Sequence, residues 1–180
     1  MTTVEPIRNK KDIERVSAYL QKYNYRDYVL FCLGINSGLR ISDILKLNVG
    51  DVKDKNYIEL TEKKTNKFKI LPLNKKLKYI FKSYTLARHK KEPLFLSKRG
   101  KRLDRVSAYR SLKSACINLG IKLHIGTHTL RKTFGYHHYK MFKDVAMLQK
   151  IFNHSSPDTT LRYIGIEQDI ISNSYKKLIL

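Results

Sequence analysis

Six polar side chains, spread along most of the chain, are of the types needed to cleave a phosphodiester without a metal ion. They are two guanidiniums, an ammonium, two imidazoles and a phenol: Arg40, Lys64, His128, Arg131, His154 and Tyr163. A phenol has a pKa of about 10, so it needs a proton acceptor or a positive field to become a nucleophile. Guanidiniums neutralise phosphate oxygens, and an ammonium can protonate a leaving 5′ oxygen. The product would be a phosphotyrosine, which permits religation without ATP.

The segments around these residues carry more information than the residues alone. They are Gly38-Leu39-Arg40-Ile41-Ser42-Asp43, His128-Thr129-Leu130-Arg131, Asn153-His154-Ser155-Ser156 and Thr159-Thr160-Leu161-Arg162-Tyr163. Taken singly, each has an ordinary alternative: a solvated arginine, a chance His-x-x-Arg pair, or one of 12 tyrosines at the surface or in the core. In this order, from about Tyr28 to Tyr163, they resemble the catalytic domain of the tyrosine recombinase (phage integrase) family.

The resemblance implies a reaction and assigns roles in it. The protein would be a site-specific recombinase that cleaves and rejoins DNA strands through a 3′-phosphotyrosyl intermediate, with no metal or other cofactor. Tyr163 would be the nucleophile. Arg40, Arg131 and His154 would hold the scissile phosphate, and His128 would handle the tyrosine proton. Two rival functions stay open: a non-catalytic DNA-binding accessory protein of the same fold, and a relaxing enzyme of the type IB topoisomerase kind.

The resemblance also assigns residues around this set. Lys64, counted back from Leu71-Pro72-Leu73, matches the family's β-turn lysine and would protonate the leaving oxygen; a solvated basic turn is the alternative. Lys63 and Lys67 would bind the DNA backbone. Asp43 matches the acidic position of Gly-x-Arg-x-x-Glu/Asp and would support Arg40 or the backbone nearby. Asn153 departs from the family's Leu-Gly-His pattern, but asparagine tolerates a left-handed backbone better than most residues.

The charge of the chain predicts its partner. A formal net charge of +22 and a pI near 10.0 indicate a polyanion. No long apolar run suggests a membrane span, so double-stranded DNA is the expected partner and no membrane is. Charge alone would equally fit a basic ribosomal or chromatin-type protein. The run from Lys98 to Arg102 could mimic a nuclear signal, but a DNA-facing loop is favoured. The remaining expected DNA contacts are Lys69, Lys98, Arg99, Lys101, Arg102 and Arg162.

Cysteine and histidine usage argue against metal binding and export. Cys32 and Cys116 lie in apolar helical patterns without metal-type spacing, which predicts reduced core residues in a cytoplasmic protein. The chain starts without the apolar core of a signal peptide. His124 and His128 are four residues apart, and His137 and His138 are adjacent. No carboxylate or cysteine completes a ligand set with them, so a metal-dependent nuclease is the weaker alternative.

The apolar patterns predict a mixed α/β fold that is mainly α-helical, the tyrosine-recombinase catalytic fold with a small antiparallel β-sheet. Helices are expected over residues 10–21, 26–37, 41–46, 75–88, 105–119, 129–140, 144–152, from Ser156-Pro157-Asp158 to Tyr163, and over 169–178. Strands are expected over 56–61 and 68–73, joined by a turn over 62–67, with Leu94-Phe95-Leu96 as a possible third strand. Pro72 should close the second strand, and Asn74 should cap the following helix.

Residues 1–180 are expected to form a single catalytic domain. Family members usually carry an N-terminal core-binding domain, but the residues before Arg40 fit the first helices of the catalytic domain, so we expect no core-binding domain here. A natural minimal protein and a fragment are both compatible with this. The apolar C-terminal residues are Ile170, Ile171, Leu178, Ile179 and Leu180. They would either dock on a neighbouring protomer, in a homotetramer on DNA, or fold back onto their own core.

Overall fold

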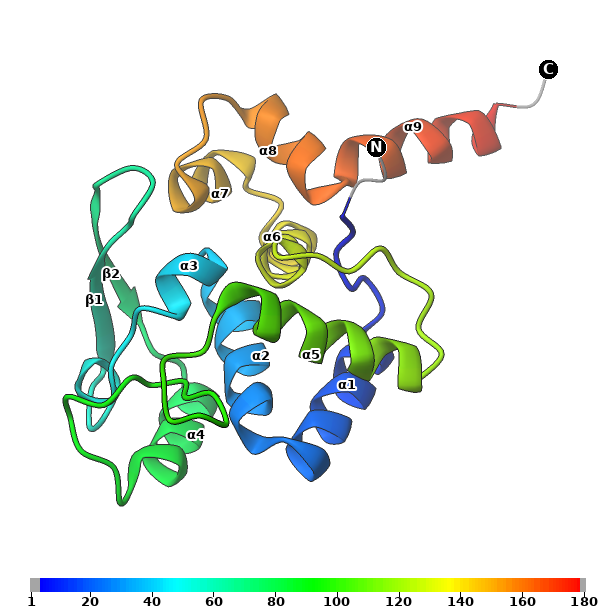
Figure 1. Ribbon diagram of the computed structural model, residues 1–180. Coiled ribbons are helices and arrows are strands. Elements are labelled where there is room, and N and C mark those ends of the chain that lie inside the picture. Colours follow the sequence, from blue (N-terminus) through cyan, green and yellow to red (C-terminus); the bar gives the residue numbers. More distant parts are fainter. Residues whose placement is uncertain (1–3, 179–180) are drawn as a thin grey trace.

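The computed structural model describes residues 4–178, and every structural statement below concerns that part of the chain. It is a mainly helical body with one β-hairpin at its edge (Figure 1). The helices and strands are α1 Lys10–Tyr23, α2 Tyr25–Ser37, α3 Ile41–Ile44, the 3-10 helix η1 Val49–Asp51, β1 Tyr57–Thr61, β2 Phe68–Pro72, α4 Lys75–Thr85, α5 Arg105–Asn118, α6 Thr129–Phe142, α7 Val145–Phe152, α8 Pro157–Ile164 and α9 Ile166–Lys177. The predicted fold class is confirmed.

Helix α2 is the centre of the core and sets the position of α6. Its residues from Tyr28 to Gly34 are all buried, as expected for a helix surrounded by other helices. A Cβ atom on Gly34 would lie 2.5 Å from Leu130, so only glycine allows α6 to cross this closely. Helix α2 ends at Gly38 in the left-handed conformation (φ 64°), which brings Arg40 to the start of α3. One helix thereby positions both segments that carry arginines.

The hairpin forms where the sequence predicts it and has a closed polar tip. Glu59 pairs with Ile70, and Thr61 pairs with Phe68. Beyond this pair, the N–H of Glu62 donates to the carbonyl of Lys67 at 3.0 Å, and the N–H of Asn66 donates to the carbonyl of Glu62 at 2.9 Å. The chain between residues 62 and 67 is therefore one tight turn fixed at both ends. Pro72 ends the second strand and the Asn74 side chain caps α4, both as predicted.

The predicted third strand is wrong. Leu94 and Phe95 are buried, but their segment forms only isolated bridges, and the sheet has two strands. The guanidinium of Arg88 donates to the carbonyls of Pro93 and Leu94 at 2.6 and 2.7 Å. The Arg88 side chain thus satisfies two backbone carbonyls that would otherwise accept hydrogen bonds from a neighbouring strand.

Several helix boundaries differ from the predictions: α1 and α6 each end two residues later than predicted, at Tyr23 and Phe142. The helix predicted over 41–46 ends at Ile44, and that predicted over 75–88 ends at Thr85. The last helix begins at Ile166 instead of residue 169, because Gly165 (φ 77°) ends α8 and α9 follows without a loop. Within residues 4–178, no helix is long and apolar enough to cross a membrane. Cys32 and Cys116 are buried free thiols.

A second, smaller core joins the C-terminal helices to α6. Phe152 and Ile164 are fully buried in it, and a Cβ atom on Gly135 of α6 would lie within 2.7 Å of both. The N-terminal segment also crosses α6: the N–H of Ile7 donates to the Thr133 hydroxyl at 2.9 Å. Arg8 pairs with Asp169 of α9 at 3.4 Å. These contacts fix the frame on which Tyr163 is carried.

Helix α9 extends away from the body of the protein (Figure 1). Ile170, Ile171 and Tyr175 of this helix, and Leu178 directly after it, are between 42% and 77% exposed. The alternative in which this helix folds back and buries its apolar residues is therefore not what the structure shows. Ile179 and Leu180, which belong to the same predicted apolar tail, lie outside the described residues.

Candidate active site

Tyr163 lies in a pocket of rings. Its hydroxyl oxygen is 3.1 Å from Nδ1 of His128, and its ring meets those of His154 and Phe152 edge-on, at centroid distances of 5.1 and 5.6 Å. Helix α8 carries it; Ser156 caps that helix, and Pro157 occupies the first turn. The segment predicted from Ser156-Pro157-Asp158 thus places the tyrosine in the last turn of a short, well-capped helix.

The tyrosine is held in its protonated form. Burial raises the pKa of Tyr163 to about 12, against the opposing positive charges of Arg131 and Arg40 and a hydrogen bond from Arg131. The pKa of His128 is lowered by its own partial burial and by the positive charges of Arg131, Lys132, Arg40 and Lys64. A neutral imidazole has a free acceptor nitrogen. His128 is therefore suited to take the phenol proton at the 3.1 Å contact.

The two arginines are both held by contacts within the protein, and both lie near Glu62. Arg131 is only 2% exposed: its Nη1 donates to the carbonyl of Gly38 at 2.6 Å, and its Nη2 to that of Phe152 at 2.8 Å. Its guanidinium also lies over the Phe152 ring, 4.3 Å from the centroid. Arg40 begins α3, and its Nη1 lies 2.8 Å from a carboxylate oxygen of Glu62. Both guanidiniums are thus fixed before any phosphate arrives.

Glu62 is a part of the site that the sequence analysis missed. Its side chain is buried between Arg40, Lys69 (3.7 Å) and Arg131 (4.0 Å). Burial raises the pKa of Glu62, but the hydrogen bond from Thr65 and the charges of Arg40 and Lys69 outweigh it, so the net pKa is lowered. The sequence does contain a signal for Glu62: it is the one acidic residue of the predicted turn 62–67, which is otherwise rich in lysine.

Asp43 supports the backbone of the hairpin rather than Arg40. It is 2% exposed, and its Oδ1 accepts a hydrogen bond from the N–H of Lys63 at 3.0 Å. This contact joins α3, which follows Arg40, to the turn that carries Lys64. The support expected from Asp43 therefore acts between two parts of the site.

The four lysines of the hairpin have different environments. Lys63 and Lys64 are exposed at the tip, and the charge of Lys64 contributes to the lowered pKa of His128. Lys67 donates to Oδ1 of Asn153 at 2.7 Å, and Lys69 donates to the carbonyl of Ile151 at 2.6 Å. The last two are therefore bound within the protein. Their predicted contacts with DNA, like those of Lys63, stay predictions.

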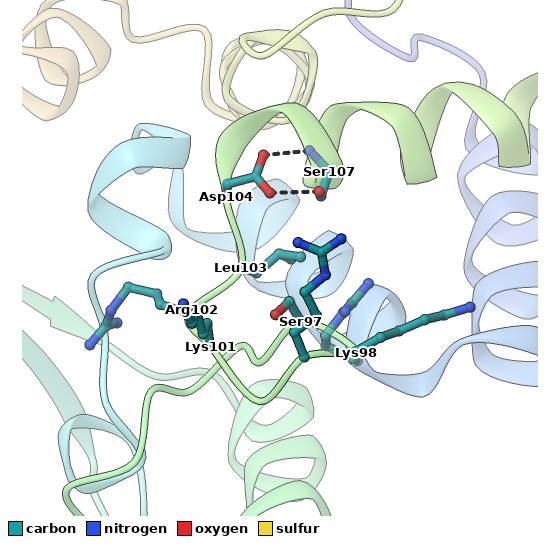
Figure 2. A pocket seen from close by; sticks show the side chains of 9 residues that line it. Ser97, Lys98, Lys101, Arg102, Leu103, Asp104 and Ser107 are labelled. Atoms are coloured by element: carbon teal, nitrogen blue, oxygen red, sulfur yellow. Dashed lines mark hydrogen bonds between the residues drawn. The ribbon is translucent and has the colours of Figure 1, made fainter.

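The basic run from Lys98 to Arg102 lines a pocket of about 580 Å³ with Arg26 and Ser107 (Figure 2). The Asp104 carboxylate caps α5 there by accepting from the Ser107 N–H and hydroxyl. Lys98, Arg99, Lys101 and Arg102 are all exposed, but the Arg102 guanidinium is bound: it donates to the carbonyls of Leu45 and Leu47 and to the Asn48 side chain. Arg102 therefore braces the chain after α3. Arg162 is exposed and pairs with Glu167 at 3.2 Å.

His154 is held by its own loop. Its Nδ1 lies 3.1 Å from the Thr160 hydroxyl, and its N–H donates to the carbonyl of Gln149 at 3.1 Å. Burial, with the charges of Arg131 and Arg40, lowers the pKa of His154 to about 4. At neutral pH the ring is therefore uncharged, and it can offer one N–H to a phosphate oxygen.

This shift predicts a loss of stability in weak acid. In the unfolded chain His154 binds a proton near its ordinary pKa of 6.5, but in the folded chain only near 4. The unfolded state therefore holds more protons between these values, and the free energy of unfolding should fall as pH drops through this window. His154→Gln should show a flatter dependence in urea denaturation between pH 7 and pH 4.5. Equal slopes for both proteins would show that the imidazole is not buried as described.

The histidines outside the site offer no metal centre. Across residues 4–178, no group of three or more His, Cys, Asp or Glu side chains is arranged to hold an ion. His137 is engaged with the carbonyl of Ile7, at 2.9 Å from its Nε2.

Solved structures share this fold. The structure of XerA recombinase superposes with a TM-score of 0.78 at 20% identity, over 98% of this chain and 65% of that one. A lambda integrase dimer bound to a COC′ core site superposes with a TM-score of 0.72 at 14% identity, over 91% of this chain and 49% of that one. The fold is that of tyrosine recombinase catalytic domains.

The sequence establishes the family. Residues 8–169 match the phage integrase family, to which this chain therefore belongs. It is 49% identical over 177 residues to the probable integrase/recombinase YoeC of Bacillus subtilis, covering 98% of this chain and 97% of YoeC. In contrast, it spans about half the length of the curated XerC recombinases it matches. The chain is thus an enzyme of the tyrosine recombinase class, and the accessory-protein and topoisomerase-like alternatives are not favoured.

Proposed function

We propose that this protein cleaves and rejoins double-stranded DNA at specific sites, with Tyr163 as the nucleophile. The observation that carries the proposal is the 3.1 Å contact between the Tyr163 hydroxyl and Nδ1 of His128, beside the buried guanidinium of Arg131. A nucleophile, a proton acceptor and a phosphate-binding group meet there. Residues 1–180 would act as one catalytic domain.

The reaction would proceed in two steps, strand cleavage and strand rejoining. His128 accepts the phenol proton while the Tyr163 oxygen attacks phosphorus, and the bond from phosphorus to the 5′ oxygen breaks. Lys64 protonates that oxygen, leaving a free 5′ hydroxyl and a 3′-phosphotyrosine. Arg40, Arg131 and an N–H of His154 stabilise the negative charge that develops on the non-bridging oxygens. A 5′ hydroxyl of a partner strand then attacks and reverses the chemistry.

DNA would bind across the face formed by the hairpin tip and the basic pocket. Lys63 is exposed at the hairpin tip, and Lys98, Arg99 and Lys101 are exposed at the pocket. Because neutralised phosphates release counterions, the affinity should fall steeply with salt concentration. The structure of lambda integrase bound to its core site shows that a protein of this fold contacts DNA as a dimer, which supports the same partner here. The cytoplasmic location stays a prediction.

The proposal is tested by measuring whether the protein forms a covalent adduct with DNA. The protein is incubated with a pool of end-labelled duplexes, each nicked so that the released fragment diffuses away and the adduct accumulates. We expect an adduct that survives denaturation and forms equally well with and without EDTA. Tight, salt-sensitive binding without any adduct would favour the accessory-protein alternative. Relaxation of a supercoiled plasmid without joining of two sites would favour the topoisomerase-like one.

We also propose that α9 joins copies of this chain into a tetramer on DNA. Its exposed Ile171 and Tyr175 would be covered by a second copy. Ile171→Lys combined with Tyr175→Lys should retain cleavage of nicked duplexes but lose complexes larger than one protein per site, measured by analytical ultracentrifugation. Tyr79→Lys, at a 75% exposed position on α4, is the control and should assemble normally. Unchanged assembly of the double variant would contradict the role of α9.

A further inference from the structure

The hairpin is attached to the loop that carries His154 by a contact between two side chains. Nζ of Lys67 donates to Oδ1 of Asn153 at 2.7 Å, across 86 residues of sequence. We propose that this pair is a latch that positions Lys64 for proton transfer to the leaving oxygen. The inference rests on the proposed function, in which Lys64 is the acid, and adds Lys67 and Asn153 to it as positioning residues.

The hairpin side of the latch transmits its position to Lys64. Lys67 and Glu62 are joined by a backbone hydrogen bond, and Lys64 lies in the turn between them. The Glu62 side chain is fixed against Arg40, and the N–H of Lys63 is fixed by Asp43. Lys67 holds the other end of the turn through its hydrogen bond to Asn153. With Lys67 bound, the turn has little freedom to carry Lys64 away from the tyrosine.

The other side of the latch is equally fixed. Asn153 ends α7 in the left-handed conformation (φ 55°), and the next residue, His154, donates its N–H to the carbonyl of Gln149. Glycine holds this conformation with less strain than any other residue. Glycine has no side chain, however, so it could not accept a hydrogen bond from Lys67. The asparagine therefore supplies an attachment point beside a phosphate-binding residue, at a cost in backbone strain.

A second contact strengthens the attachment. Lys69, two residues along the same strand, donates to the carbonyl of Ile151 at 2.6 Å. Lys67 and Lys69 thus reach the end of α7 together, in the region where Figure 1 shows the hairpin tip beside that helix. Lys64 has no hydrogen bond or ion pair in the described part of the chain. The turn therefore has bound lysines that locate it and an unbound one that remains free to act.

The latch should affect only the protonation of the leaving group. It can therefore be tested with a substrate whose leaving group needs no proton. A duplex whose scissile 5′ oxygen is replaced by sulfur releases a thiolate, which needs no proton because its conjugate acid is far stronger than an alcohol. On ordinary nicked DNA, Asn153→Gly should slow adduct formation about fivefold, as expected for one lost hydrogen bond. On the sulfur-containing duplex it should match the wild type. Asn153→Asp, which keeps the acceptor, should react normally with both.

Two controls assign the effect. Lys64→Met should be slowed more than Asn153→Gly on ordinary DNA and should also recover on the sulfur-containing duplex. The double variant Lys67→Met, Asn153→Gly should be no slower in the chemical step than Lys67→Met alone. Each substitution removes the same Lys67–Asn153 hydrogen bond, so the second has nothing further to remove. Asn153→Gly should melt at or above the wild-type temperature, since glycine is the favoured residue at that helix end.

The outcomes separate the latch from the proposed function. Wild-type rates for Asn153→Gly on both duplexes would overturn the latch and leave the function standing. Equal slowing on both would also overturn it, because the defect would then not concern the leaving group. If Lys64→Met is not rescued by sulfur, Lys64 is not the acid and the latch has no role. If the wild type forms no adduct with either duplex, the proposed function itself is wrong.

Discussion

Tyr163→Phe is expected to abolish the covalent protein–DNA adduct while leaving the fold and the DNA affinity nearly unchanged. Phenylalanine lacks only the hydroxyl, so its ring can keep the edge-on contacts with Phe152 and His154. The lost hydrogen bond to His128 should cost no more than about 1 kcal/mol of stability. Without a nucleophile, however, cleavage should fall by at least about 10⁴-fold.

The measurement is denaturing electrophoresis of labelled, nicked duplexes after reaction with each protein. Thermal unfolding and salt-dependent DNA binding should be measured on the same preparations, so that a lost adduct cannot be attributed to misfolding. Tyr175→Phe is the matched control: Tyr175 is 77% exposed on α9, and its variant should form the adduct at the wild-type rate. A persistent adduct in Tyr163→Phe would mean that another side chain attacks DNA.

The sequence allowed the prediction of the features that depend on local signals. Gly38 ends α2, Asn74 and Ser156 cap helices, and the switch from helical to alternating periodicity marks the hairpin. These signals act within a few residues, so they can be recognised without knowing the fold. They place Arg40, His128, Arg131 and Tyr163 at the ends of elements that the core then brings together.

What the sequence could not provide is the choice of partner for each charged side chain. Lys67 and Arg102 were expected to face DNA, yet their partners here lie 86 and 54 to 57 residues away in the chain. The apolar run at Leu94 correctly indicated burial, but burial does not require a strand when Arg88 satisfies the nearby carbonyls. In a chain with a formal charge of +22, acids are too few to pair every cation, so Lys67 and Arg102 bind amide and carbonyl oxygens instead. Glu62, in contrast, lies within 4.0 Å of three cationic side chains.

Glu62→Gln is expected to destabilise the protein by about 3 kcal/mol, because removing one partner of a buried ion pair leaves uncompensated charge. Arg40 lies 2.8 Å from the carboxylate, with Lys69 at 3.7 Å and Arg131 at 4.0 Å. Glutamine has the same size and can still accept from Thr65, so the change removes charge rather than volume. Urea denaturation at pH 7.5 measures the loss. Glu59→Gln, on the exposed face of β1, should match the wild type.

The pH dependence of this difference gives an independent check. The pKa of Glu62 is lowered in the folded state, so the unfolded chain takes up its proton first as pH falls below the ordinary value of 4.5. The stabilisation from the carboxylate is present above that pH and is lost as pH falls through the folded pKa. The gap between wild type and Glu62→Gln should therefore narrow in acid, while the contribution of His154 cancels because both proteins contain it. A gap that is constant with pH would show that the carboxylate is not the counter-ion of the two arginines.

Bound DNA should also narrow the stability difference between the wild type and Glu62→Gln, because a phosphate supplies the missing negative charge and stabilises the variant more than the wild type.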